Sequence, residues 1–135
     1  MNKIEHLGIA VKDLDAAEKM YEDLLGVQSY KREEVPTEGV TTSFFKCGES
    51  KIELLVGTNP NSPISRYVEK RGEGLHHIAY AVDDIRSEIE RLKEKGFVAL
   101  NEEPKIGADN KLVAFLHPKS AGGVLVELCQ DRSPE

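Results

Sequence analysis

The segment His6-Leu-Gly-Ile-Ala-Val-Lys-Asp-Leu14 occurs a second time in the chain as His77-Ile-Ala-Tyr-Ala-Val-Asp-Asp-Ile85. The two copies align without a gap at a constant offset of 71 residues. Internal similarity at a fixed offset is the sequence signature of a repeated structural unit. The chain is therefore predicted to contain two copies of one module.

The residues after each copy follow the helical period and then the strand period. Apolar side chains recur at helical spacing within Asp15–Leu25 and within Asp84–Lys95, and Gly26 and Gly96 are the expected C-terminal caps. Three strand-like runs follow in each half: Val27–Tyr30, Thr41–Cys47 and Lys51–Val56, then Val98–Leu100, Leu112–Leu116 and Val124–Cys129. This pattern predicts an α+β fold of two tandem βαβββ modules.

The order of these segments predicts one domain over residues 1–135, with module one over 3–57, a connecting segment over 58–73 and module two over 74–130. In the connecting segment, Ser62 is the expected N-cap of a short helix that runs from Pro63 to Val68. The tail from Asp131 to Glu135 is predicted to be disordered.

Composition excludes several classes of protein. The net charge of −6 argues against a nucleic-acid binder, which depends on neutralising phosphates. No apolar run approaches the roughly 20 residues of a membrane helix, and the first residues, Met1 to His6, form no apolar signal region. The two cysteines, Cys47 and Cys129, lack CxxC spacing, so reduced thiols are expected, with a single bridge between them as the alternative. We therefore expect a soluble cytoplasmic protein.

Strand alternation assigns the two repeated histidines to comparable faces. His6 shares its face with Gly8 and Ala10, and His77 shares its face with Ala79 and Ala81. The small residues leave room above the sheet for a group that is not protein, whereas the face of His76 carries larger side chains. A hydrogen-bonded core histidine is the alternative, but the duplication favours a site.

Each histidine has a matching glutamate in the last strand of its module. The segment Ile52-Glu53-Leu54 in the first module corresponds to Val126-Glu127-Leu128 in the second. Glu127 shares its face with Leu125 and Cys129, where a carboxylate needs a partner or a metal ion. For Glu53 an exposed strand face is the alternative. Two imidazoles and two carboxylates suit Zn, Co, Ni, Mn or Fe, with coordination positions left open for a substrate.

These features resemble the vicinal oxygen chelate (glyoxalase) superfamily, in which two βαβββ modules form a cupped sheet around a metal site. Within it, the chain is most similar to the methylmalonyl-CoA epimerase family. The segments that carry the resemblance are His6–Val11, Lys51–Leu55, Ser62–Ile64, Gly72–Ile78, Glu103–Ala108 and Phe115–Leu128. The resemblance implies the metal ligands His6, Glu53, His77 and Glu127, and glutamine replaces Glu53 in some relatives.

The resemblance also implies an activity, namely interconversion of (R)- and (S)-methylmalonyl-CoA by a 1,1-proton transfer through an enediolate. The implied cofactor is a divalent metal ion, with cobalt favoured and Mn, Ni or Zn permitted by the ligands. The implied partners are a small acyl-CoA substrate and a second copy of the chain in a homodimer, with neither nucleic acid nor membrane.

Epimerisation needs an acid–base group on each face of the planar intermediate. Some epimerases of the family use a glutamate at the position that Thr42 occupies here, and threonine is a poor base at neutral pH. Our hypothesis is that Glu127 serves one face and Glu53 the other, each moving between metal ligation and proton transfer. A water molecule or a residue from a loop is the alternative for the second acid.

The loop His117–Gly123 is a candidate substrate contact. Its residues Lys119, Ser120, Gly122 and Gly123 offer a cation, a hydroxyl and backbone amides to the substrate carboxylate or to CoA phosphates. A plain turn with a solvated lysine is the alternative. Lys105 and Lys111 are expected to be solvated charges.

Two other functions are compatible with these residues. Lactoylglutathione lyase (glyoxalase I) uses the same set of ligands on the same modules. A metal-free protein that sequesters a small molecule is a further possibility on this fold, although it has no reason to keep four ligands.

Overall fold

The computed structural model describes residues 1–132, and the chain separates into two compact units. The module-one unit is His6–His76, and the module-two unit is Met1–Glu5 together with the residues from His77 onward. The first strand, β1 (Lys3–Ala10), therefore contributes its opening residues to the module-two unit.

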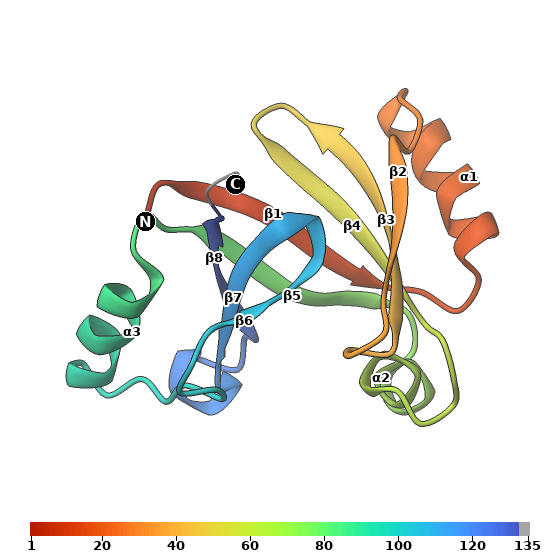
Figure 1. The fold of residues 1–135 in the computed structure, drawn as a ribbon. Helices are drawn as coiled ribbons and strands as arrows, with labels where there is room; N and C mark the ends of the chain where they lie inside the picture. The colour runs from red at the N-terminus through yellow and green to blue at the C-terminus, as the bar shows by residue number, and fades with distance from the viewer. Residues whose placement is uncertain (133–135) are drawn as a thin grey trace. The chain divides into compact units, whose positions relative to one another are not determined.

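The module-one unit is a four-stranded mixed sheet with a helix packed on it (Figure 1). Its strands lie in the order β2-β3-β4-β1, with antiparallel β2–β3 and β3–β4 pairs and a parallel β4–β1 pair. The elements after β1 are α1 (Leu14–Leu25), β2 (Lys31–Val35), β3 (Val40–Cys47), β4 (Ser50–Gly57) and α2 (Pro63–Arg71). Helix α1 buries Leu14 and Ala17 in a core that includes Phe45 and Leu54.

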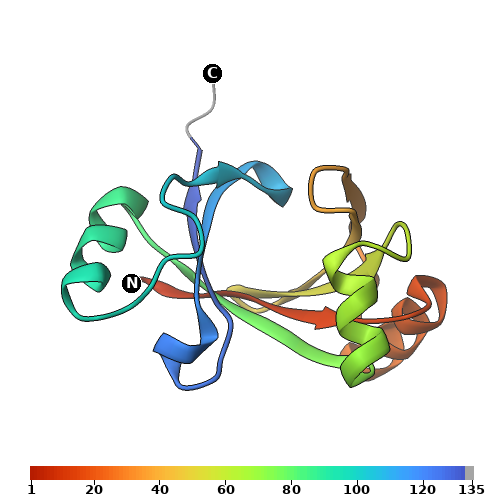
Figure 2. The same ribbon diagram turned by 90° about the horizontal axis from the view of Figure 1, so that it is seen from below.

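The module-two unit repeats this arrangement (Figure 2). Its strands lie in the order β6-β7-β8-β5, again with two antiparallel pairs and a final parallel pair. The elements are β5 (Gly74–Ala81), α3 (Ile85–Glu94), β6 (Lys105–Ile106), β7 (Lys111–Leu116) and β8 (Val126–Asp131). Helix α3 buries Ile85, Ile89 and Leu92 in the core of the unit. The prediction of two tandem βαβββ modules is confirmed.

The capping signals explain where the helices begin and end. The side chains of Asp13 and Asp84 accept hydrogen bonds from Ala16 N and Ser87 N, and Gly26 ends α1 with a φ of 74°. Ser62 caps α2 as predicted, but this helix continues to Arg71. The predicted cap Gly96 lies one residue beyond the actual C-cap of α3, which is Lys95.

Two predicted strands are misplaced. The run Val27–Tyr30 precedes β2, which instead forms from the charged segment Lys31–Val35 because that segment pairs with Val40–Phe44. The run Val98–Leu100 forms only an isolated bridge from Ala99 to Leu116, and β6 lies later, at Lys105–Ile106. In both places the strand forms later in the chain than predicted, from a segment that contains charged residues and lies at an edge of the sheet.

The end of the chain departs from the prediction in smaller ways. The last strand, β8, begins at Val126, two residues later than predicted, and extends to Asp131. Asp131 is thus ordered within a strand, and residues 133–135 of the predicted tail lie outside the described residues. No helix within residues 1–132 has both the length and the apolar character needed to cross a membrane.

Candidate metal centre

The first half of the candidate site is a buried histidine–glutamate pair in the module-one unit. The parallel register of β1 and β4 places Gly8 opposite Glu53, so His6 and Glu53 lie on the same sheet face. Nδ1 of His6 and Oε2 of Glu53 are 3.1 Å apart. Glu53 is only 5% exposed, which excludes the alternative of an exposed strand face.

The second half is the equivalent pair in the module-two unit. The register of β5 and β8 places Ala79 opposite Glu127, and Nε2 of His77 lies 2.9 Å from Oε1 of Glu127. Both side chains are buried. His76, by contrast, contacts the ring of Tyr67 edge-on at a centroid distance of 4.8 Å. The pair that the structure brings together therefore contains His77, as the strand faces predict.

Each glutamate also has a phenylalanine opposite it on the neighbouring antiparallel strand. Phe44 of β3 pairs with Glu53, and Phe115 of β7 pairs with Glu127. These phenylalanines are separated by the same 71 residues as the histidines. The Phe115 ring contacts the His77 ring edge-on at 5.8 Å, which restricts the orientation of that imidazole.

The donor atoms of both pairs fit a divalent transition metal. Neighbouring nitrogen and oxygen ligands around one octahedral ion, each about 2.1 Å from it, are about 3.0 Å apart. The observed separations of 3.1 and 2.9 Å match this spacing. Burying two carboxylates among apolar side chains also requires compensating charge or hydrogen bonds, and a cation would supply that charge.

A further buried carboxylate, Glu5, was not predicted as a site residue. Glu5 is 4% exposed and lies 3.7 Å from Nζ of Lys111, which also pairs with Asp131. The prediction that Lys111 is a solvated charge is therefore wrong. Leu7 and Ile9 lie on the same face of the strand as Glu5. These two apolar neighbours were the signal that could have indicated the burial of Glu5.

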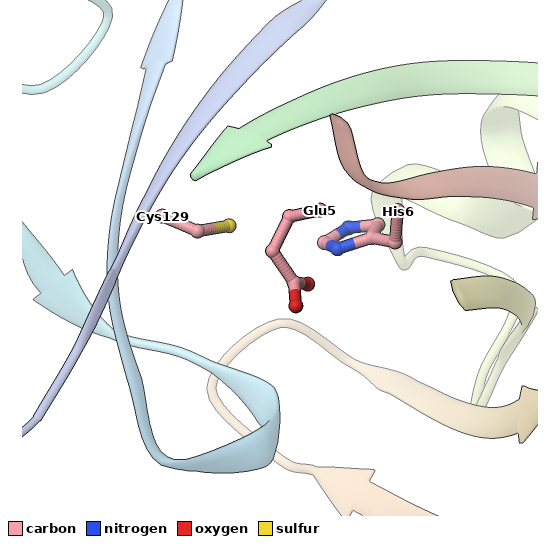
Figure 3. Close-up of side chains that lie close together, drawn as sticks. All are labelled: Glu5, His6 and Cys129. Atoms are coloured by element: carbon pink, nitrogen blue, oxygen red, sulfur yellow. The ribbon is translucent and has the colours of Figure 1, made fainter. Parts of the chain in front are cut away.

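The Cys129 thiol lies beside the Glu5 carboxylate and the Glu127 carboxylate. A carboxylate oxygen of Glu5 and Sγ of Cys129 lie within 4.8 Å of each other, and Figure 3 shows the two side chains. Sγ of Cys129 donates a hydrogen bond of 3.1 Å to Oε2 of Glu127. Glu5, Cys129 and Lys111 line a cavity of about 230 Å³ in the module-two unit.

Thr42 occupies the sheet face of the first half-site. It lies opposite Leu55, two residues along β4 from Glu53, and is 1% exposed. A threonine hydroxyl does not act as an acid or a base at neutral pH. Glu53 and Glu127 are therefore the candidate acid–base groups of the two half-sites.

The predicted substrate loop is a structured turn, Pro118–Ala121, after β7. The Ser120 hydroxyl donates to the carbonyl of His117 and accepts from the amide of Val98, and the Gly123 amide donates to the carbonyl of Pro118. Lys119 is exposed, and Gly122 ends the turn with a φ of 67°. The Ser120 hydroxyl and the Gly123 amide are thus already hydrogen-bonded within the protein.

Comparisons with known proteins identify the family of the chain. The family model described as "Glyoxalase/Bleomycin resistance protein/Dioxygenase superfamily" matches residues 5–115. The chain is 45% identical to the ethylmalonyl-CoA/methylmalonyl-CoA epimerase of Cereibacter sphaeroides, over 96% of this chain and 98% of that protein. It is 43% identical to the mitochondrial methylmalonyl-CoA epimerase of Homo sapiens, over 96% of this chain and 74% of that protein.

A solved structure extends the similarity to three dimensions. A methylmalonyl-CoA epimerase in complex with methylmalonyl-CoA and NH4+ superposes with a TM-score of 0.94 at 33% identity. The match covers 100% of this chain and 98% of that chain.

Proposed function

The chain belongs to the Glyoxalase/Bleomycin resistance protein/Dioxygenase superfamily, and we propose that it interconverts (R)- and (S)-methylmalonyl-CoA. The observation that carries this function is the pair of buried histidine–glutamate contacts at equivalent positions of the repeat. The names of the relatives favour the epimerase over lactoylglutathione lyase and over a metal-free sequestering protein.

We assign His6, Glu53, His77 and Glu127 as the ligands of one divalent metal ion per chain. When bound, the ion would supply the positive charge that stabilises negative charge developing on the thioester and carboxylate oxygens of the substrate. Cobalt is the metal we favour, and the ligand set also accepts Mn, Ni or Zn.

The proton transfer itself is assigned to the two glutamates. One carboxylate removes the proton from the carbon between the thioester and the carboxylate, and the other, present as a carboxylic acid, delivers a proton to the opposite face. The two glutamates exchange protonation states in each turnover, so the reaction runs equally well in reverse. Their equivalence in the repeat is the reason for assigning one glutamate to each face.

Contacts to the rest of the substrate are assigned to the loop after β7. The exposed Lys119 can approach a carboxylate or phosphate, and Ser120, Gly122 and Gly123 set the shape of the turn that presents it. Lys119→Ala should therefore raise KM by more than it lowers kcat.

We further propose a homodimer in the cytoplasm. In the module-one unit, a groove of about 490 Å³ is lined by Val11, Met20 and Tyr21, and Met20 is 52% exposed. A second copy of the chain would cover this apolar surface. Cys47 and Cys129 form no disulfide with each other, which is compatible with a reducing compartment.

The function is tested by NMR in deuterium oxide with enantiomerically pure methylmalonyl-CoA. Cobalt-loaded protein should incorporate deuterium at the α-carbon while chiral purity is lost, and chelator-stripped protein should do neither. Ethylmalonyl-CoA tests the wider substrate range of the Cereibacter relative. Turnover of the hemithioacetal of glutathione and methylglyoxal, with no deuterium exchange into methylmalonyl-CoA, would contradict the epimerase function and indicate lactoylglutathione lyase activity.

A further inference from the structure

The two candidate glutamates differ in the residue that lies two positions after each of them. The sequence Glu53-Leu54-Leu55 in β4 corresponds to Glu127-Leu128-Cys129 in β8. Alternation places each second residue on the face of its glutamate. Leu55 has no hydrogen-bond donor in its side chain, whereas the thiol of Cys129 donates to Oε2 of Glu127 at 3.1 Å.

The surroundings of Cys129 favour donation of its single hydrogen to Glu127. Glu5 is the other carboxylate near the thiol, and its charge is matched by the ammonium group of Lys111 at 3.7 Å. Cys129 is 2% exposed, so water competes little for the thiol. A hydrogen bond to a charged acceptor is stronger in such a setting than in water.

We propose that Cys129 is a positioning residue that holds the Glu127 carboxylate in the orientation required for metal binding and proton transfer. The inference rests on the proposed role of Glu127. Oε1 of Glu127 faces Nε2 of His77 and Oε2 faces the thiol, so both oxygens are fixed and rotation of the carboxylate about its last torsion is restricted.

The hydrogen bond from Cys129 should contribute measurably to metal affinity or activity. Groups that orient a metal ligand typically contribute 10- to 100-fold to metal affinity or activity. The equivalent position in module one, Leu55, cannot act in this way through a hydrogen bond, so the effect should be specific to the module-two pair.

The test compares Cys129→Ser, which keeps a donor, with Cys129→Ala, which differs from it by one oxygen atom. The cobalt(II) dissociation constant is measured by competition with a fluorescent chelator, alongside kcat, KM and the melting temperature of the metal-free protein. Cys47→Ala is the matched control, since Cys47 is an exposed free thiol. We expect Cys129→Ala to lose about 10- to 100-fold in cobalt affinity or kcat with KM within about twofold, and Cys129→Ser to retain most of both.

Two results would overturn the proposal: wild-type cobalt affinity and kcat in Cys129→Ala, or equal losses in the serine and alanine variants, which would indicate packing rather than a hydrogen bond. If the wild-type protein binds cobalt but has no epimerase activity, the proposed function fails separately. The positioning role of Cys129 is then tested only by the difference in cobalt affinity between Cys129→Ser and Cys129→Ala. A wild-type protein that does not bind cobalt would overturn both.

Discussion

The two histidine–glutamate pairs share a strand topology but differ in how the ring meets the carboxylate. His6 approaches Glu53 through Nδ1, whereas His77 approaches Glu127 through Nε2. In the module-two pair, the Phe115 ring contacts His77 and the Cys129 thiol donates to Glu127. The repeat thus fixes which residues meet, while the neighbouring side chains give each pair its own setting.

The packing of helix on sheet differs between the modules in a similar way. In module one, Glu18 of α1 accepts hydrogen bonds from Arg32 and from Ser43, the latter at 2.6 Å. In module two the residues 71 positions after Glu18 and Ser43 are Ile89 and Ala114, which belong to one apolar core cluster. The corresponding positions are therefore polar in one module and apolar in the other.

The largest effect should come from removing one histidine ligand from either pair. His6→Gln and His77→Gln should each lower kcat/KM at least about 10³-fold, since stabilisation by a metal ion is worth several kcal/mol. Cobalt content and kcat/KM are the measurements. His76→Gln is the matched control and should keep both. Normal activity in only one of the two ligand variants would mean that a single module forms the site.

Replacing one glutamate at a time should separate the two faces of the reaction. Glu53→Gln keeps an oxygen ligand but cannot carry the proton, so we expect epimerisation to fall about 10²-fold or more while cobalt stays bound. The remaining Glu127 should still exchange the α-proton of one enantiomer with deuterium, and Glu127→Gln should exchange the other. Near-normal epimerisation by Glu53→Gln would exclude it as the second acid–base group.

A smaller effect is expected from the phenylalanine that contacts His77. Phe115→Leu removes an aromatic contact worth about 0.5–1.5 kcal/mol, so cobalt affinity should fall about two- to tenfold. Phe44→Leu, at the equivalent position beside Glu53, is the comparison variant. Equal losses of affinity in the two variants would show that the ring–ring contact adds nothing specific to module two.

The smallest effect concerns stability and its dependence on pH. Hydrogen bonds from Arg32 hold the pKa of Glu18 below its ordinary value of 4.5, despite the opposing effect of burial. Because the folded-state pKa is lowered, this stabilisation is present above pH 4.5 and is lost as the pH falls through the folded-state pKa.

Urea unfolding across this range checks the prediction. Glu18→Gln should lower the free energy of unfolding by about 1.5 kcal/mol at pH 7, and the difference from wild type should shrink as the solution is acidified. The control, Ile89→Val in module two, should lower it by about 1 kcal/mol at every pH. A difference for Glu18→Gln that does not change with pH would contradict the assigned charge interaction.

The sequence predicted the repeat, the helices and the candidate ligands because each depends on local spacing. The repeated His6 and His77 segments, the caps at Gly26 and Ser62 and the alternation around Glu127 all act within a few residues. The edge strand β2 was missed because its charged residues become a strand only through pairing with β3. Polar edge strands are common and carry no apolar signal.

The contacts that distinguish the two pairs could not be predicted for a related reason. The ion pair between Glu5 and Lys111 joins residues 106 positions apart, and the ring contact between His77 and Phe115 joins strands whose register is set by folding. The thiol of Cys129 was placed on the face of Glu127, but alternation alone does not show which atom accepts its hydrogen.

The most direct test of the central claim, that one metal ion is shared by the two pairs, is a cobalt(II) titration of metal-free protein followed by visible absorption. A single shared ion predicts saturation at one ion per chain, and loss of the spectrum in both His6→Gln and His77→Gln. Saturation at two ions per chain, or an unchanged spectrum in either variant, would contradict it.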